Sequence, residues 1–299
     1  MASAQSWVKA ARLRTLPLAL SSIAMGGFVA GIESSFRLMP VIFAGITTLL
    51  LQILSNFAND YGDSKSGIDN KNRVGPTRTV QSGEITKSEM KIAVLIFSGL
   101  SLISGLLLVF FAAQISLTGK IILLLLGLGA IVAAIKYTVG KRPYGYIGLG
   151  DLFVFIFFGL VAVIGTYFLA TNSFHWTILL PAISMGMFSS GVLNLNNLRD
   201  IANDRLSGKR TLVVSLGYSK ALFYHAMLIL VPFILLSWFA FEKKPELLSF
   251  AFLLLFPLFL KDLIDIFKSE GNASLDPYLK KLALKTLLLT IIFGLTINL

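Results

Sequence analysis

The sequence predicts an all-α protein: a single transmembrane bundle of about nine helices, forming one domain over residues 1–299. Hydrophobic residues make up 56% of the chain and charged residues only 14%, and the mean hydropathy is +0.81. A soluble domain carries about 25% charged residues, so this composition is typical of an integral membrane protein. The apolar stretches approach the ~20 residues that a membrane-spanning helix needs.

The expected spans begin after a polar, basic segment that runs from Met1 to Arg14. The first apolar stretch lacks a clear small-residue cleavage site and opens a series of similar stretches. We therefore expect a first span there and not a removed signal peptide. Apolar length places the spans near residues 16–33, 40–58, 91–115, 119–138, 148–170, 175–198, 219–241, 247–266 and 282–298.

Lysine and arginine fall almost entirely on one side of this series. Of the 26 basic residues, 22 lie in five alternate connections, and the other connections hold only Arg37, Lys120, Lys243 and Lys244. The positive-inside rule then predicts an inner (plasma) membrane protein with a cytoplasmic N-terminus and an external C-terminus. This asymmetry explains much of the net charge of +11, so the expected partner is the lipid bilayer and no nucleic acid is needed.

Five of the 15 acidic residues form two clusters at the ends of predicted spans. Asp60 and Asp63 are three residues apart and share one face of a helix, and Asp69 follows them. Asp200 and Asp204, four residues apart, form the second cluster. Carboxylates beside a bilayer are costly unless a cation compensates them. Both clusters fall on the predicted cytoplasmic side, so we expect these five residues to hold Mg²⁺ against a phosphorylated ligand.

Polar and basic residues around the clusters complete the candidate site. Magnesium commonly takes one or two carboxylates together with substrate phosphate, and Arg and Lys match phosphate oxygens. The chain has no cysteine, which excludes thiolate catalysis and thiolate metal sites. For any single aspartate, helix capping or pairing with a nearby Lys or Arg stays open as the alternative. The substrate-binding candidates are Asn56, Asn59, Arg78, Asn197, Lys209 and Arg210.

A run rich in glycine and tyrosine lies between residues 136 and 151 and contains Lys136, Tyr137 and Tyr146. One interpretation is an ordinary cytoplasmic turn with interfacial aromatic side chains. The other is a wall beside the acids, in which Gly and Pro fix a sharp re-entry and the Tyr rings face a cation. We include these three residues among the substrate-binding candidates.

Both acidic clusters resemble the Asp-rich motifs of the UbiA superfamily of intramembrane aromatic prenyltransferases. The first reads Asn-Phe-Ala-Asn-Asp-Tyr-Gly-Asp at residues 56–63, with Gly67 and Asp69 behind it. The second reads Asn-Asn-Leu-Arg-Asp at residues 196–200, with Asp204 behind it. Hydropathy and motif order also agree, so the resemblance covers essentially the whole chain.

Within the superfamily the chain is most similar to the 1,4-dihydroxy-2-naphthoate polyprenyltransferases of menaquinone synthesis. The ending Gly67-Ile68-Asp69, the second motif and the run at residues 144–151 carry this similarity, although that branch often has Glu where Asp151 stands. The ubiquinone branch spaces the last two acids of the first motif by three residues. Gly67 occupies that place here, which counts against a 4-hydroxybenzoate substrate.

The resemblance implies a chemistry for these residues. Magnesium at the five aspartates would bind the diphosphate of a polyprenyl donor and help the allylic carbon–oxygen bond to break, assisted by Arg78, Lys209 and Arg210. The allylic cation would then meet dihydroxynaphthoate, with loss of carbon dioxide, to give demethylmenaquinol. Asn59 and Asn197 would orient ligands. The base that deprotonates the ring hydroxyl stays open among Lys136, Tyr137 and Tyr146.

Two alternatives remain at this point. The first is a prenyltransferase for another aromatic acceptor, of the homogentisate or 4-hydroxybenzoate type. The second is a secondary transporter, in which charges and broken helices mark ion sites near the membrane midplane. The acids here cluster at one face of the membrane instead, which disfavours transport.

Overall fold

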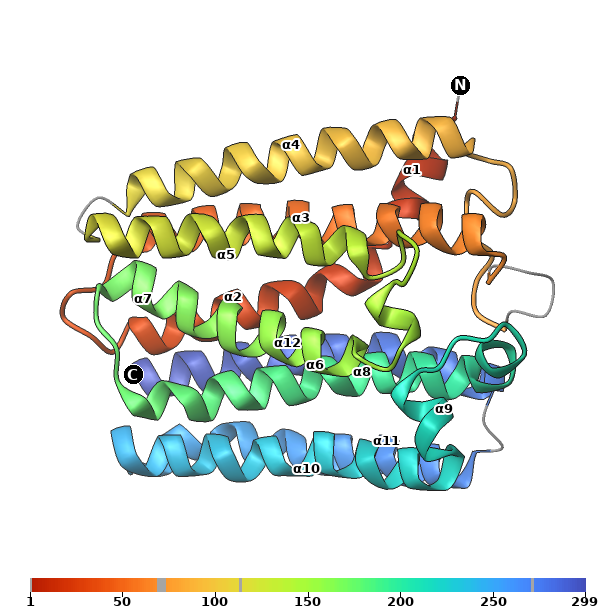
Figure 1. Ribbon diagram of the computed structural model, residues 1–299. Coiled ribbons are helices and arrows are strands. Elements are labelled where there is room, and N and C mark those ends of the chain that lie inside the picture. The colour runs from red at the N-terminus through yellow and green to blue at the C-terminus, as the bar shows by residue number, and fades with distance from the viewer. Residues whose placement is uncertain (1, 69–73, 113–114, 270–271) are drawn as a thin grey trace.

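The computed structural model describes residues 2–68, 74–112, 115–269 and 272–299, and these residues form helices joined by short connections (Figure 1). In chain order the α-helices are α1 (Ala4–Ala11), α2 (Leu16–Ala30), α3 (Leu38–Ser66), α4 (Lys87–Phe111), α5 (Leu117–Lys136), α6 (Gly150–Val154), α7 (Gly165–Thr171), α8 (Leu179–Leu206), α9 (Leu212–Leu216), α10 (Tyr218–Lys243), α11 (Phe256–Lys268) and α12 (Asp276–Asn298). Shorter helical segments are η1 (Leu13–Thr15), η2 (Tyr144–Tyr146), η3 (Phe155–Ile164), η4 (Trp176–Ile178), η5 (Leu247–Leu255) and η6 (Asn272–Leu275).

Nine helical segments within the described ranges are long and apolar enough to cross a membrane, which confirms the all-α bundle expected from the sequence. Two of them extend further than hydropathy indicates. Helix α3 continues beyond residue 58 to Ser66, and α8 continues beyond residue 198 to Leu206. Both extensions carry acidic residues, which lower the apolar signal without interrupting the backbone hydrogen bonds of the helix. The final span begins at Asn272, before the predicted residue 282.

Local sequence signals set the ends of these helices. Helix α3 stops where Gly67 adopts a left-handed conformation with φ of 76°, which glycine reaches without a steric penalty. Gly208, with φ of 73°, follows the end of α8 in the same way. Helix α4 starts with a reciprocal cap, because the Thr86 side chain accepts a hydrogen bond from the Glu89 amide while the Glu89 carboxylate accepts one from the Thr86 amide. Caps of this kind position the connections that border the site.

The long helices run roughly along one common direction, so their connections gather at two ends (Figure 1). We call one end the basic end; it holds α1, α9 and the C-terminal ends of α3, α5, α8 and α11. The C-terminus and the connections that precede α3 and α8 lie at the opposite end. The ends of α3 and α8 that carry Asp60, Asp63, Asp200 and Asp204 both lie at the basic end.

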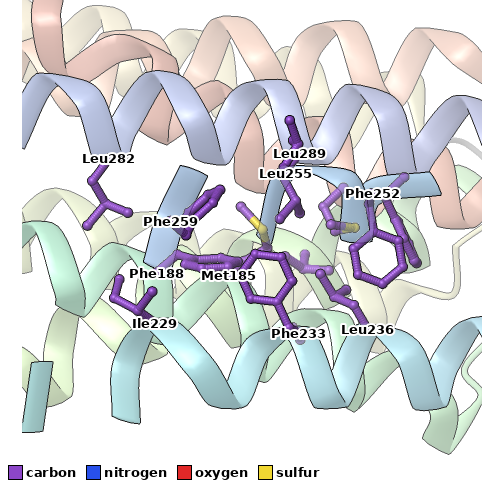
Figure 2. Close-up of a cluster of buried hydrophobic side chains, with 14 of the residues drawn as sticks. Met185, Phe188, Ile229, Phe233, Leu236, Phe252, Leu255, Phe259, Leu282 and Leu289 are labelled. Atoms are coloured by element: carbon purple, nitrogen blue, oxygen red, sulfur yellow. The ribbon is translucent and has the colours of Figure 1, made fainter. Parts of the chain in front are cut away.

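A large aromatic cluster packs the second half of the chain (Figure 2). Phe188 of α8 lies against Phe233 of α10 and Phe259 of α11, with ring centroids 6.0 and 5.6 Å apart. A separate cluster between α3 and α4 includes Leu54 and Met90. Burial of such side chains holds α8 against α10 and α11, and α3 against α4.

The segment between α6 and α7 is π-helical over ten residues, Phe155–Ile164. Its close approach to α8 depends on glycine. A Cβ atom added at Gly159 would lie 2.6 Å from the carbonyl oxygen of Ala182, and one at Gly186 would lie 2.8 Å from the Phe155 ring. π-Helix is rare in proteins, and where it occurs it is often found at functional sites. This segment is part of the wall of a cavity.

Candidate active site

A cavity of about 730 Å³ opens between α2, α3, α5, α8 and the π-helical segment η3. Along α3 its wall extends from Ala44 to Asp63, which at 1.5 Å per residue is about 28 Å. Charged and amide side chains line the part at the basic end, and Leu, Ala and Phe side chains line most of the remainder. This shape suits a molecule with an anionic head and a long apolar chain.

Asp60 and Asp63 of the first acidic cluster lie on the last turns of α3, and Asp60 is only 1% exposed. Its carboxylate accepts a hydrogen bond of 3.0 Å from Arg78 and another of 3.0 Å from the Thr79 hydroxyl. The Arg12 guanidinium also donates to it. Two cations therefore compensate one buried carboxylate, which explains why Asp60 is tolerated there.

Arg12 and Thr79 are site residues that the sequence reasoning missed. Arg12 sits in a left-handed conformation, φ of 51°, at the break between α1 and η1. The Asn56 amide, which lines the cavity as predicted, holds this break by donating to the Ala11 carbonyl (2.8 Å). The only sequence signal for Arg12 was its positive charge, which topology already explained.

The second acidic cluster lies on the last turns of α8. Arg199 donates to both oxygens of Asp200, at 3.1 and 2.7 Å, and it is itself fully buried. The Lys209 ammonium lies 3.5 Å from Asp204 Oδ2, an oxygen that accepts no hydrogen bond from the described residues. Asn197 Oδ1 is likewise buried without a hydrogen-bond partner there. These two oxygens have free capacity for a cation.

Tyr146 joins the two clusters. Its hydroxyl donates a 2.6 Å hydrogen bond to Asp63 Oδ1, and its backbone carbonyl accepts a 2.9 Å hydrogen bond from the Arg210 amide. Lys209 lies 5.9 Å from the centre of its ring. The run at residues 136–151 is therefore a wall beside the acids, as the second of the two interpretations expected.

Glycines in the same run make room for Tyr137, which lines the cavity. A Cβ atom at Gly145 would lie 2.9 Å from the Tyr137 ring, and one at Gly150 would lie 3.2 Å from it. Burial raises the pKa of the Tyr137 phenol, and the charges of Asp151, Asp63 and Asp204 raise it further. The phenol is therefore a neutral hydrogen-bond donor or acceptor in the site.

The predicted site residues fall into three groups. Asn56, Asn59, Asp60, Asp63, Arg78, Tyr137 and Lys209 line the cavity. Asn197, Asp200 and Asp204 are buried, and Tyr146 is half-buried; none of these four is in the cavity wall. Lys136 and Arg210 are exposed and do not line the cavity. Asp69 lies outside the described residues.

The donor set fits a hard divalent cation that is held partly by its substrate. Over the described parts of the chain, no three His, Cys, Asp or Glu side chains are close enough to form a metal site by themselves. Magnesium does not need such a cage, because it usually combines one or two carboxylates with phosphate oxygens and water. The oxygens of Asp204 and Asn197 that lack a hydrogen bond are the kind of ligand this requires.

Comparisons with known proteins show the family to which the chain belongs. The UbiA prenyltransferase family matches residues 19–294. A 1,4-dihydroxy-2-naphthoate octaprenyltransferase of Haemophilus influenzae is 43% identical over 97% of this chain and 94% of its own length. The Escherichia coli protein of the same description is 42% identical over 98% and 95%. A UbiA homolog of Archaeoglobus fulgidus, solved with DMAPP and Mg²⁺, has a TM-score of 0.66 at 16% identity and covers 98% of this chain and 99% of its own.

Proposed function

Because the chain belongs to the UbiA prenyltransferase family, we propose that it transfers a polyprenyl group from polyprenyl diphosphate to 1,4-dihydroxy-2-naphthoate, releasing carbon dioxide and giving demethylmenaquinol. One observation carries this proposal. Asp60 and Asp63 of α3 and Lys209, which pairs with Asp204 of α8, line the polar end of a long, mostly apolar cavity. The relatives that are 42–43% identical support the choice of acceptor.

The diphosphate occupies the polar end of the cavity. Asp60, Asp63, Asp69, Asp200 and Asp204 are the residues that would hold magnesium, and the metal would supply positive charge to the leaving diphosphate. Arg78 and Lys209 reach the same space and neutralise its remaining charge. The apolar length of the cavity accepts the isoprenoid chain, and its Leu, Ala and Phe walls exclude water that would convert an allylic cation to an alcohol.

The proposed reaction breaks two bonds and forms one carbon–carbon bond, and its electron pairs balance. The allylic carbon–oxygen bond breaks, and its electron pair leaves with the diphosphate. The ring carbon that bears the carboxylate then supplies the pair for the new carbon–carbon bond. Loss of carbon dioxide returns a pair to the ring, so no oxidant and no net proton acceptor is required. The neutral Tyr137 phenol and the electron-rich faces of Tyr137 and Tyr144 border this step.

The reaction is tested with purified protein in lipid nanodiscs, Mg²⁺, a polyprenyl diphosphate and dihydroxynaphthoate. Mass spectrometry should detect a prenylated, decarboxylated product, and a chelator should abolish it until Mg²⁺ is restored. Equimolar homogentisate and 4-hydroxybenzoate serve as competing acceptors. A dominant product from either competitor would reject the proposed acceptor. In a separate measurement with proteoliposomes, uptake of a solute without any product would favour transport.

We propose a cytoplasmic N-terminus and an external C-terminus in the inner membrane, because the basic residues gather at the end of the bundle that holds the acids. The chain has no cysteine, so Ala2→Cys and Leu299→Cys each introduce a single label site. A membrane-impermeant maleimide added to intact cells should label only the Leu299→Cys protein. Labelling of Ala2→Cys alone would reverse the orientation.

A further inference from the structure

The Arg199 guanidinium ties the second acidic cluster to the start of the last helix. On α8 it donates to Asp200 at 3.1 and 2.7 Å. Its Nη1 donates to Asp276 Oδ1 of α12 at 2.5 Å, and the other oxygen of Asp276 accepts a 3.3 Å hydrogen bond from Arg14. An Arg–Asp–Arg–Asp chain therefore connects three segments that are far apart in the sequence.

Arg199 forms its hydrogen bonds within the protein and is inaccessible to ligands. A further hydrogen bond of 2.8 Å joins its Nη2 to Asn196 Oδ1. The connection after α3 covers it, because a Cβ atom on Gly75 would lie 2.5 Å from Nη2. With no exposed surface and four hydrogen bonds to protein oxygens, Arg199 does not bind diphosphate. Its effect on the reaction passes through Asp200.

The charges in this chain are balanced. Arg14 and Arg199 contribute two positive charges, and Asp200 and Asp276 contribute two negative charges. Without Asp276, the full charge of Arg199 would act on Asp200 alone. A carboxylate held that way is a poorer ligand for a divalent cation, because the guanidinium and the metal compete for the same oxygens.

We propose that Asp276 is a positioning residue for the reaction: it shares the charge of Arg199 and thereby leaves Asp200 correctly oriented and available to a divalent metal. This role deepens the proposed function and rests on its metal–diphosphate site. Asp276 lies 76 residues beyond Asp200 and does not line the cavity, so it does not touch the substrate. The connection makes the start of α12 part of the catalytic end of the bundle.

The test compares Asp276→Asn with a matched control. Asp276 is one-third exposed, and asparagine keeps a side-chain oxygen that can accept the hydrogen bond from the buried Arg199. The control is Asp262→Asn, which removes the acidic partner of Lys285 (2.7 Å) in the other ion pair of α12. Both are purified as full chains in nanodiscs. Binding of Mn²⁺ alone is followed by electron paramagnetic resonance, and binding of inorganic pyrophosphate with chelator present is followed by calorimetry.

We expect Asp276→Asn to weaken Mn²⁺ binding about tenfold, because it adds one net positive charge beside Asp200. The same added charge should leave pyrophosphate binding unchanged or make it tighter. Asp262→Asn should bind both as the parent protein does, and Asp276→Glu, which keeps the charge, should restore Mn²⁺ binding. These opposite responses to cation and anion separate a charge effect from damage to the fold.

Two results would overturn the positioning role. One is unchanged Mn²⁺ binding in Asp276→Asn; the other is a parallel loss of Mn²⁺ and pyrophosphate binding, which is what simple unfolding produces. A failure of the proposed function looks different. In that case the parent protein itself binds no Mn²⁺, or it makes no prenylated naphthoquinol in the assay described above.

Discussion

The Tyr146 hydroxyl donates a 2.6 Å hydrogen bond to Asp63, and this contact joins the connection after α5 to the first acidic cluster. The same residue accepts a backbone hydrogen bond from Arg210, next to the second cluster. Its geometry makes Tyr146 a link between the two halves of the site. Substitutions there should therefore change catalysis more than they change stability.

Replacing Tyr146 by Phe removes the hydroxyl and keeps the ring beside Lys209. A hydrogen bond to a charged group contributes about 1.5–3 kcal/mol, so we expect kcat to fall at least about tenfold. The value of kcat is measured by steady-state kinetics at several Mg²⁺ concentrations. The control is Tyr278→Phe, which removes a phenol that lies near Asp265 and outside the cavity wall. An equal loss of activity in both variants would contradict the linking role of Tyr146.

Arg12→Gln should raise KM for the polyprenyl diphosphate about tenfold, because it removes one of two cations that compensate Asp60 at the diphosphate end. Lys120→Gln deletes a positive charge at the opposite end of the bundle and should leave KM unchanged. Initial rates at several donor concentrations provide the measurement. A change confined to the KM of the aromatic acceptor would place Arg12 at the other substrate.

The close contact of η3 with α8 predicts a stability effect at Gly159. Alanine there would meet the Ala182 carbonyl at 2.6 Å, so we expect a loss of about 1–3 kcal/mol and a lower melting temperature. Gly105→Ala in α4 is the control, since nothing lies within 4 Å of the added Cβ. Alanine favours a helix, so this variant should melt at or slightly above the parent temperature.

The far part of the cavity should select donors by chain length. Ala44 lies in its wall about 28 Å along α3 from Asp63, so Ala44→Phe fills space that only a long isoprenoid reaches. The rate with an octaprenyl donor should fall several-fold more than the rate with geranyl diphosphate. Ile46→Phe on the same helix is the control, because Ile46 is 43% exposed and lies outside the cavity wall. Equal losses with both donors would argue against this path.

Composition and charge were sufficient to predict the bundle and the end at which the acids gather. The spacing of Asp60 with Asp63, and of Asp200 with Asp204, placed each pair on a helix because an i,i+3 or i,i+4 pattern shares one face. Hydropathy alone marks only the apolar parts of α3 and α8, since it measures apolarity and not the backbone hydrogen bonds that continue through acidic turns.

Contacts between segments that are distant in the chain could not be predicted from the sequence. Arg12 meets Asp60 because α1 packs against α3, and Asp276 meets Arg199 because α12 starts beside the end of α8. Neither pair has a local pattern, and their charges were already explained by membrane orientation. The two interpretations of the run at residues 136–151 were separated only by the hydrogen bond of Tyr146.

The π-helical segment η3 has a consequence for insertions and deletions. Each residue of an ordinary helix turns the chain by about 100°, so deleting one residue between Phe155 and Ile164 would rotate everything that follows by that angle. Gly165 and Leu169, which now face the cavity, would swing away from it. The length of this segment, more than the identity of its apolar side chains, therefore governs which face of α7 borders the isoprenoid.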